Sequence, residues 1–274
     1  MKIVNFIHIG PGRSGTTYIY EALKHHNDIV LPIIKDLNFF NENYKKGIDW
    51  YHSKFDDVKS GKYGELSNKY FYNNKVAERI YNYNHDIKII TVLRNPYEFI
   101  LSAYNYRKKS GELPPEISFI EAVSQQPDLL KNCEYERLLN PYINKWESDK
   151  LFIRLFEDFK NDQANFFDDL AKFLSIEKFS QLPEKKVNPS GKLRFGFLWK
   201  VANWSANKLR ELEFYRIMNF AKHNSFIRKI VYKDKNREDD ITENIFSNEL
   251  IAQINSEIEK LEKLLNKDLG DWKK

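Results

Sequence analysis

The sequence predicts an α/β fold with three layers, in which helices flank a central parallel sheet and a helical C-terminal extension follows. Short apolar runs alternate with helical patterns along most of the chain, as in parallel sheets with crossover helices. The last part of the chain is dominated by helical periodicity. With 274 residues, 42% hydrophobic and 15% aromatic, the chain can bury a full core. We expect a single domain, 1–274, in which about 196–274 form the mainly helical extension.

The predicted strands are short, apolar and β-branched, at 3–9, 87–93 and 151–156. Residues 87–93 make the best central strand, because nearly all of them are apolar. Apolar residues at spacings of three and four predict helices at 16–25, 97–107, 162–174 and from about 248. Pro96 suits the first turn of the second helix, and Ser247 is the expected cap of the last.

Composition limits the function classes. The net charge of +5, from 44 basic and 39 acidic residues, is too mild to indicate nucleic acid and is equally consistent with an anionic small ligand. A single cysteine, Cys133, allows no internal disulfide and no cysteine-based metal site. No apolar run is long enough to span a bilayer, and the N-terminus lacks a signal-peptide pattern. We therefore expect a cytoplasmic protein, of undetermined oligomeric state.

A glycine-rich turn, Gly10 to Thr17, joins the first strand to the first helix and predicts a phosphate-binding loop. Its G-x-x-x-x-G spacing is that of a P-loop, but Thr16 stands where the lysine of nucleotide hydrolases would be. Arg13 supplies a positive charge from inside the loop instead. We therefore expect a P-loop-like fold whose loop suits a terminal phosphate better than a metal-bound triphosphate. The candidate binding residues are Gly12, Arg13, Ser14, Gly15, Thr16 and Thr17.

A second candidate phosphate site follows the central strand. Arg94 lies just past the end of that strand, where ligands of open α/β sheets bind. Ser102 lies in the second turn of the next helix and is able to face back toward the loop. An arginine and a serine so placed can share a second phosphate.

The two stretches together resemble the PAPS-dependent sulfotransferase family, in particular bacterial members related to the heparan-type carbohydrate sulfotransferases. Residues 13–17 are similar to the family's K/R-x-G-T-T loop, which holds the 5′-phosphosulfate. Arg94, Pro96 and Ser102 match its R-x-P-x(5)-S stretch, which holds the 3′-phosphate. The stretch 187–194 is similar to a late basic loop that closes over the nucleotide in the family. Its matching residues are Ser190, Gly191, Lys192 and Arg194.

The resemblance also implies a proton acceptor. Residues 31–40 are similar to the K-E-x-H-F-F stretch of heparan-type members, in which the glutamate is the catalytic base. Asp36 falls on that glutamate and Asn38 on the histidine, so both depart from the pattern. We expect Asp36 to act as the base and Arg13 to stabilise the leaving phosphate oxygens. Lys35 is either a donor to the sulfuryl group or a solvated lysine.

Residues 64–70 are similar to the family's G-E-K-T/S-P-x-Y segment. Leu66 replaces its lysine, which argues against a heparan-like acceptor, and Lys69 is a candidate substitute for that lysine. The six histidines show no ligand or triad spacing, and we expect them to be structural.

The resemblance implies an enzyme that moves a sulfuryl group from 3′-phosphoadenosine 5′-phosphosulfate (PAPS) to a hydroxyl or amine of a carbohydrate or small metabolite. Transfer is expected to be in line, with a carboxylate base, adenosine 3′,5′-bisphosphate as product and no metal required. Neither a nucleic-acid partner nor a membrane span is expected. Two alternatives remain open from the sequence. One is a Mg-ATP-dependent small-molecule kinase with a degenerate P-loop; the other is a catalytically inactive, nucleotide-binding relative.

Overall fold

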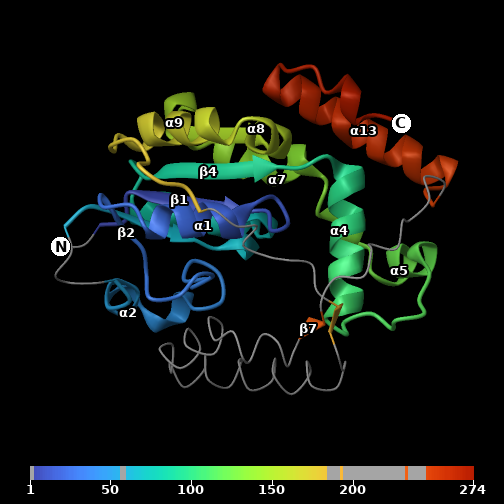
Figure 1. Cartoon of the computed structure of the whole chain (residues 1–274), viewed down its shortest axis with the longest axis horizontal. Coiled ribbons are helices and arrows are strands. Elements are labelled where there is room, and N and C mark those ends of the chain that lie inside the picture. Colours follow the sequence, from blue (N-terminus) through green and yellow to red (C-terminus); the bar gives the residue numbers. More distant parts are fainter. Residues whose placement is uncertain (1–2, 56–59, 184–191, 194–231, 234–244) are drawn as a thin grey trace. The chain divides into compact units, whose positions relative to one another are not determined.

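The computed structural model describes residues 3–55, 60–183, 192–193, 232–233 and 245–274 (Figure 1). The chain forms two compact units, each built from two stretches of sequence. The first unit comprises Met1–Asn95 and Glu134–Asn188, and the second comprises Pro96–Cys133 and Pro189–Lys274. Whether the two units act as one domain stays a prediction from sequence.

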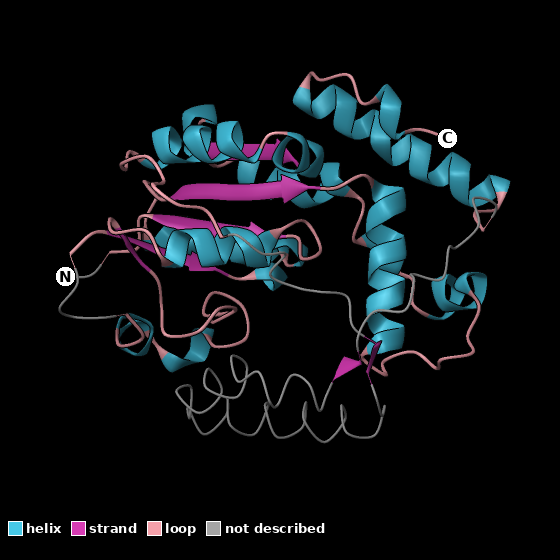
Figure 2. Ribbon diagram, viewed as in Figure 1, coloured by secondary structure: helices cyan, strands magenta, loops and turns pink. Residues whose placement is uncertain are grey.

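The first unit contains a five-stranded sheet with the order β2-β3-β1-β4-β5, in which all neighbouring strands are parallel (Figure 2). Its strands are β1 (Phe6–Gly10), β2 (Ile29–Val30), β3 (Lys62–Leu66), β4 (Lys88–Leu93) and β5 (Leu151–Leu155). The predicted first strand begins later than residue 3, because the partners of Phe6 on both sides, Gly64 and Lys88, mark where pairing starts.

Helices accompany these strands in the first unit. They are α1 (Thr16–Lys24), α2 (Ile48–His52), α3 (Asn74–Tyr83), α7 (Tyr135–Ile143), α8 (Phe156–Asn161) and α9 (Gln163–Leu174), with short 3₁₀ turns η1 (Tyr44–Lys46), η2 (Asn68–Tyr72) and η3 (Ser148–Lys150). The helices predicted at 16–25 and 162–174 are confirmed to within one residue at each end. The side chain of Asp162 accepts a hydrogen bond from the N–H of Asn165 and so caps α9 rather than belonging to it.

The core of the first unit lies on one face of the sheet. Phe6, Ile90, Val92 and Phe152 point to this face and pack against apolar residues of α1, α8 and α9. All five residues of β1 are buried, so its other face is covered as well. The result is the predicted central parallel sheet with helices on its faces.

Two strands, β2 and β3, were not among the sequence-predicted strands. The sequence of β3, Lys-Tyr-Gly-Glu-Leu, has none of the apolar continuity of a buried parallel strand. Gly64 is nevertheless required there, because a Cβ at this position would lie 2.0 Å from the ring of Phe6 in β1. The following Glu65 is fully buried and satisfied by hydroxyl groups, as described below.

The second unit is mainly helical in its described part. It contains α4 (Pro96–Lys109), α5 (Phe119–Gln125), α6 (Asp128–Lys131), the two-residue strands β6 (Lys192–Leu193) and β7 (Tyr232–Lys233), α13 (Asn248–Leu265) and η4 (Gly270–Trp272). The hydroxyl of Tyr97 in α4 donates to Asn255 Oδ1 of α13 at 2.9 Å. Ser247 caps α13, as predicted, by accepting from the N–H of Leu250. Across the described ranges, no helix combines the length and apolarity needed to cross a membrane.

Candidate functional site

The predicted phosphate loop connects β1 to α1 and has a backbone that depends on glycine. Gly10 and Gly15 adopt φ of 106° and 75°, and Arg13 between them also has a positive φ of 68°. A Cβ on Gly15 would lie 3.0 Å from the ring of Phe159. Positive φ and close packing both exclude most side chains at such positions. The loop is therefore held in one shape by the unit around it.

The N-terminus of α1 is arranged as an anion site. Gly15 is its N-cap residue and, having no side chain, places no capping group over the first N–H groups of the helix. The partial positive charge of a helix N-terminus attracts phosphate groups. In addition, Ser14 Oγ is buried and has no hydrogen-bond partner among the described residues. Thr16 and Thr17 add two hydroxyls at the same helix end.

Lys35 brings a positive charge to this loop from a different part of the chain. Its Nζ donates to Thr16 Oγ1 at 3.3 Å and to Thr17 Oγ1 at 3.4 Å. The usual P-loop lysine follows the second glycine of the loop, where this chain has Thr16. An ammonium group is thus present beside the loop, although the sequence lacks it at the usual position.

Arg94 contacts the phosphate loop directly. Its guanidinium donates to the carbonyl oxygen of Arg13 at 3.2 Å and stacks over the ring of Phe156, 5.0 Å from its centre. The carbonyl oxygen of Arg94 in turn accepts from the hydroxyl of Tyr135 at 2.9 Å. The structure therefore brings together Arg94 and the loop that carries Arg13, as expected for residues at the carboxyl ends of neighbouring strands.

Asp36 lies in the loop after β2 with a positive φ of 59°. Its N–H donates to the carbonyl oxygen of Leu66 at 2.9 Å, and its Oδ1 accepts from the N–H of Asn68 at 3.0 Å. Asn68 also packs against the phosphate loop, because a Cβ on Gly10 would lie 2.5 Å from its carbonyl oxygen. Asp36, its neighbour Lys35 and the phosphate loop thus lie together at the carboxyl ends of the strands.

His8 in β1 is fully buried behind this edge. Burial, and secondarily the charge of Lys35, lowers the pKa of His8 to about 3. Its Nδ1 accepts from the N–H of Gly10 at 3.1 Å, so the neutral ring carries its proton on Nε2. We assign His8 a structural role, as expected from sequence.

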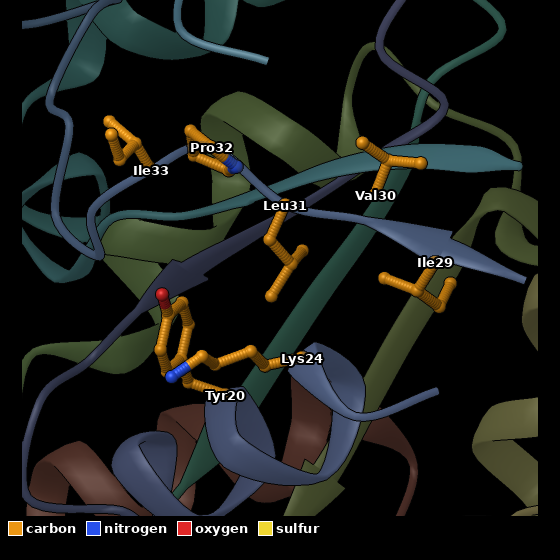
Figure 3. A pocket seen from close by; sticks show the side chains of 7 residues that line it. All are labelled: Tyr20, Lys24, Ile29, Val30, Leu31, Pro32 and Ile33. Atoms are coloured by element: carbon orange, nitrogen blue, oxygen red, sulfur yellow. The ribbon is translucent and has the colours of Figure 1, made fainter. Parts of the chain in front are cut away.

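A cavity of about 230 Å³ lies beside α1 (Figure 3). Its lining consists of Tyr20 and Lys24 from α1 and of residues 29–33, whose Leu31 points toward the helix. Burial raises the pKa of Tyr20 to about 12, and the charges of Glu21 and Asp36 add to the effect. The Tyr20 hydroxyl is therefore neutral. It lines a cavity with both polar and apolar walls, and it is close enough to Asp36 for the charge of that carboxylate to affect its pKa.

The described structure gives no position relative to this site for several predicted residues. Ser102 lies in α4 and belongs to the second unit. Ser190, Gly191 and Arg194 lie outside the described residues, and for Lys192 only the backbone is described, paired with Lys233 in the β6–β7 pair. The roles of these five residues remain predictions from the resemblance.

Lys69, considered as a substitute for the lysine that Leu66 replaces, has its Nζ 2.6 Å from Glu42 Oε1.

Glu65, two residues before Ser67, received no role from the sequence. The sequence shows that Glu65 shares a short segment with Ser67 and Tyr70. Only the fold shows that the hydroxyls of these two residues contact the Glu65 carboxylate.

A model of the sulfotransferase domain matches residues 5–269, which is most of the chain. The chain belongs to the sulfotransferase family. This confirms the family predicted from the loop and Arg94 motifs, and no more specific membership follows from it.

Relatives of known description agree with this family. The membrane-associated sulfotransferase kil1 of Dictyostelium discoideum is 31% identical over 156 residues, which cover 53% of this chain and 33% of kil1. The human bifunctional heparan sulfate N-deacetylase/N-sulfotransferase 3 is 29% identical over 197 residues, 64% of this chain and 22% of that protein. The matches thus span a third or less of the length of these relatives.

Solved sulfotransferases confirm the predicted fold. A sulfotransferase from Alicyclobacillus acidocaldarius aligns with a TM-score of 0.68 at 20% identity, over 99% of both chains. Mouse sulfotransferase SULT7A1, solved in complex with PAP, aligns with a TM-score of 0.51 at 16% identity, over 99% of this chain and 88% of that one.

Proposed function

We propose that this sulfotransferase moves the sulfuryl group of PAPS to a hydroxyl of a carbohydrate or small-metabolite acceptor. The observation that carries the proposal is the contact of Lys35 Nζ with the hydroxyls of Thr16 and Thr17 at the N-terminus of α1. This contact gives the loop an ammonium group, two hydroxyls and a helix N-terminus without the lysine of a nucleotide hydrolase. Such a set suits a phosphosulfate, whose negative charge lies on one phosphate and one sulfuryl group.

The residues present fit this donor. Gly12 to Thr17 and Lys35 would hold its 5′-phosphosulfate, and the unpartnered, buried Ser14 Oγ is available to it. Arg94, which contacts the loop, and Ser102 are proposed to hold the 3′-phosphate. By the resemblance, Ser190, Gly191, Lys192 and Arg194 are proposed to bind the nucleotide as well. The family match and the nucleotide bound by mouse SULT7A1 support the proposal.

Asp36 is the proposed base. In the transfer, the bond between sulfur and the bridging phosphate oxygen breaks while a bond between sulfur and the acceptor oxygen forms. The acceptor proton passes to the Asp36 carboxylate, and the electron pair of the broken bond stays on adenosine 3′,5′-bisphosphate. Asp36 Oδ1 is engaged by the N–H of Asn68, which fixes the orientation of the carboxylate for this step.

The acceptor is proposed to enter by the cavity beside α1. Its volume of about 230 Å³ is that of a single ring rather than of a polymer segment. Leu31 and Pro32 offer an apolar wall for the face of a ring, while Tyr20 and Lys24 offer polar groups for its substituents. A cytoplasmic location stays a prediction from the sequence.

Isothermal titration calorimetry tests the donor. The protein should bind adenosine 3′,5′-bisphosphate in EDTA, and much more tightly than it binds ATP with Mg²⁺. The reverse preference would support the kinase alternative and reject the proposal.

Transfer of ³⁵S from labelled PAPS to a panel of sugars, phenols and amines then tests the reaction. Tight nucleotide binding without transfer to any member of a broad panel would support the inactive alternative.

A further inference from the structure

Glu65 lies near the end of β3, opposite Ile7 of β1, and is bound by three hydroxyl groups. Its side chain is fully buried. Its Oε1 accepts from Ser67 Oγ and from the hydroxyl of Tyr70, and its Oε2 accepts from the hydroxyl of Tyr51, each at 2.6 Å. Within the described part of the chain, no lysine or arginine forms an ion pair with it. A buried carboxylate is here compensated by neutral donors rather than by an opposite charge.

The same hydroxyls continue the network into the loop that carries Asp36. Ser67 Oγ accepts from the N–H of Asn38, and the Tyr70 hydroxyl accepts from the N–H of Phe40, both at 2.9 Å. The backbone of Phe39 adds a hydrogen bond to the carboxylate itself. Three consecutive residues of the loop are therefore bound to Glu65, directly or through one hydroxyl.

The direction of these hydrogen bonds follows from the chemistry of a carboxylate. A carboxylate only accepts, so Ser67 and Tyr70 must each give it their single proton, which leaves their oxygens as acceptors for the loop amides. Burial raises the pKa of Glu65, and the hydrogen bonds from the hydroxyls act in the opposite direction. Burial and the charge of Glu65 raise the pKa of Tyr51 and Tyr70 well above 10.0, so both remain proton donors.

The loop held in this way is strained. Asp36 and Asn38 adopt positive φ values of 59° and 52°, which non-glycine residues reach at a cost of about 1–3 kcal/mol each. Such a conformation persists only where its surroundings determine it. Segment 65–70 supplies several of the described ties of this loop: the Glu65 network holds residues 38–40, while Leu66 and Asn68 hold Asp36. Arg79 also donates to the carbonyl oxygen of Phe40, at 2.8 Å.

We propose that Glu65 is a positioning residue for sulfuryl transfer: through Ser67 and Tyr70 it fixes the strained loop that presents Asp36 and Lys35 to the phosphate loop. The proposal rests on the proposed function, in which Asp36 is the base. Glu65 itself lies in the core and does not touch the reacting groups.

Tyr51 and Tyr70 provide a matched pair of variants. Both hydroxyls donate to Glu65 at 2.6 Å, both side chains are fully buried, and Phe keeps either ring in place. Only the Tyr70 hydroxyl also accepts from a loop amide among the described residues. The variants Tyr70→Phe and Tyr51→Phe thus each remove one hydroxyl bond to Glu65, from Oε1 and Oε2 respectively, and differ in whether the loop is released.

The experiment measures amide hydrogen exchange of peptides covering residues 36–41, kcat for transfer from PAPS to the best panel acceptor, and the Kd of adenosine 3′,5′-bisphosphate. Tyr70→Phe should speed exchange at Phe40 and lower kcat, each by about tenfold or more, as expected on loss of one buried hydrogen bond. The Kd should rise by a smaller factor than kcat falls, because Lys35 is the one member of this loop among the residues proposed to hold the nucleotide. Tyr51→Phe should change both exchange and kcat by less than about threefold at a similar melting temperature.

Equal effects of the two variants on exchange and on kcat would overturn the proposal. A Tyr70→Phe variant whose kcat loss merely follows its loss of folded protein would also do so. If the wild-type protein transfers no sulfate at all, the proposed function fails, and the exchange comparison still decides whether Glu65 holds the loop.

Discussion

Lys35 Nζ lies 3.3 Å from Thr16 Oγ1, although the two residues are 19 positions apart in the sequence. A P-loop places its lysine next to the second loop glycine, so that loop and cation come from one segment. Here the cation comes from the segment that also carries the candidate base. Donor binding and proton acceptance thus depend on the same short loop, since Asp36 follows Lys35 directly.

Replacing Lys35 by methionine tests the cation. Lys35→Met should lower kcat/KM for transfer from PAPS by about 100-fold, the usual effect of removing one group that stabilises charge on a leaving group. Lys69→Met is the control, since that ammonium is exposed and bound to Glu42. It should change kcat/KM by less than about threefold, as surface ion pairs contribute little. Similar losses in both variants would show that Lys35 has no special part in the reaction.

Asp36→Asn tests the base. The asparagine Oδ1 can still accept from the N–H of Asn68, so the loop should keep its conformation and the Kd of adenosine 3′,5′-bisphosphate should not change. Loss of general base catalysis should lower kcat by about 100-fold or more. Single-turnover transfer of labelled sulfate measures this. Retention of wild-type kcat would mean that another group accepts the proton.

Gly10→Ala tests the close approach between the phosphate loop and Asn68. Gly47→Ala is a control with a positive φ of 81° and no atom within 4 Å of its new Cβ. The control should lose about 1–3 kcal/mol of unfolding free energy, the cost of the backbone conformation alone. Gly10→Ala should lose clearly more in urea denaturation, because its Cβ would also lie 2.5 Å from the carbonyl oxygen of Asn68. Equal losses would contradict the close approach.

The buried His8 should make stability depend on pH. The pKa of His8 is about 3 in the folded protein, against an ordinary histidine value of 6.5, so between these values the unfolded chain binds a proton that the folded protein does not. Stability contributed by this group is therefore lost as the pH falls from about 6.5 toward 3, with a slope of up to about 1.4 kcal/mol per pH unit.

His8→Asn removes this titration while its Oδ1 can still accept from the N–H of Gly10. Urea denaturation at several pH values between 4 and 7 should show a flatter dependence in the variant than in wild type. Parallel curves for the two proteins would show that His8 does not titrate differently in the folded and unfolded states.

Local chemistry explains which parts of the fold were predictable. The strands β1, β4 and β5 are apolar runs, and the residues of the phosphate loop are neighbours in sequence, so both could be recognised. β3 was missed because its Gly64 and Glu65 are unusual in a buried strand and make sense only against the Phe6 ring and the hydroxyls of other segments.

The same limit applies to the candidate site. The contact of Lys35 with Thr16 and the convergence of Tyr51 and Tyr70 on Glu65 are tertiary, and no spacing in the sequence indicates them. Sequence similarity pointed to Asp36, but only the fold shows that its backbone is strained and which groups hold it.

The loop that carries Asp36 also covers part of the β3 edge that β2 leaves unpaired. β2 pairs only with Lys62 and Tyr63 of β3, and beyond them the N–H of Asp36 takes up the carbonyl oxygen of Leu66. An open strand edge can pair with other chains and start aggregation. The segment proposed to carry the base therefore also shields the edge of β3, so a change that releases this loop endangers solubility as well as turnover.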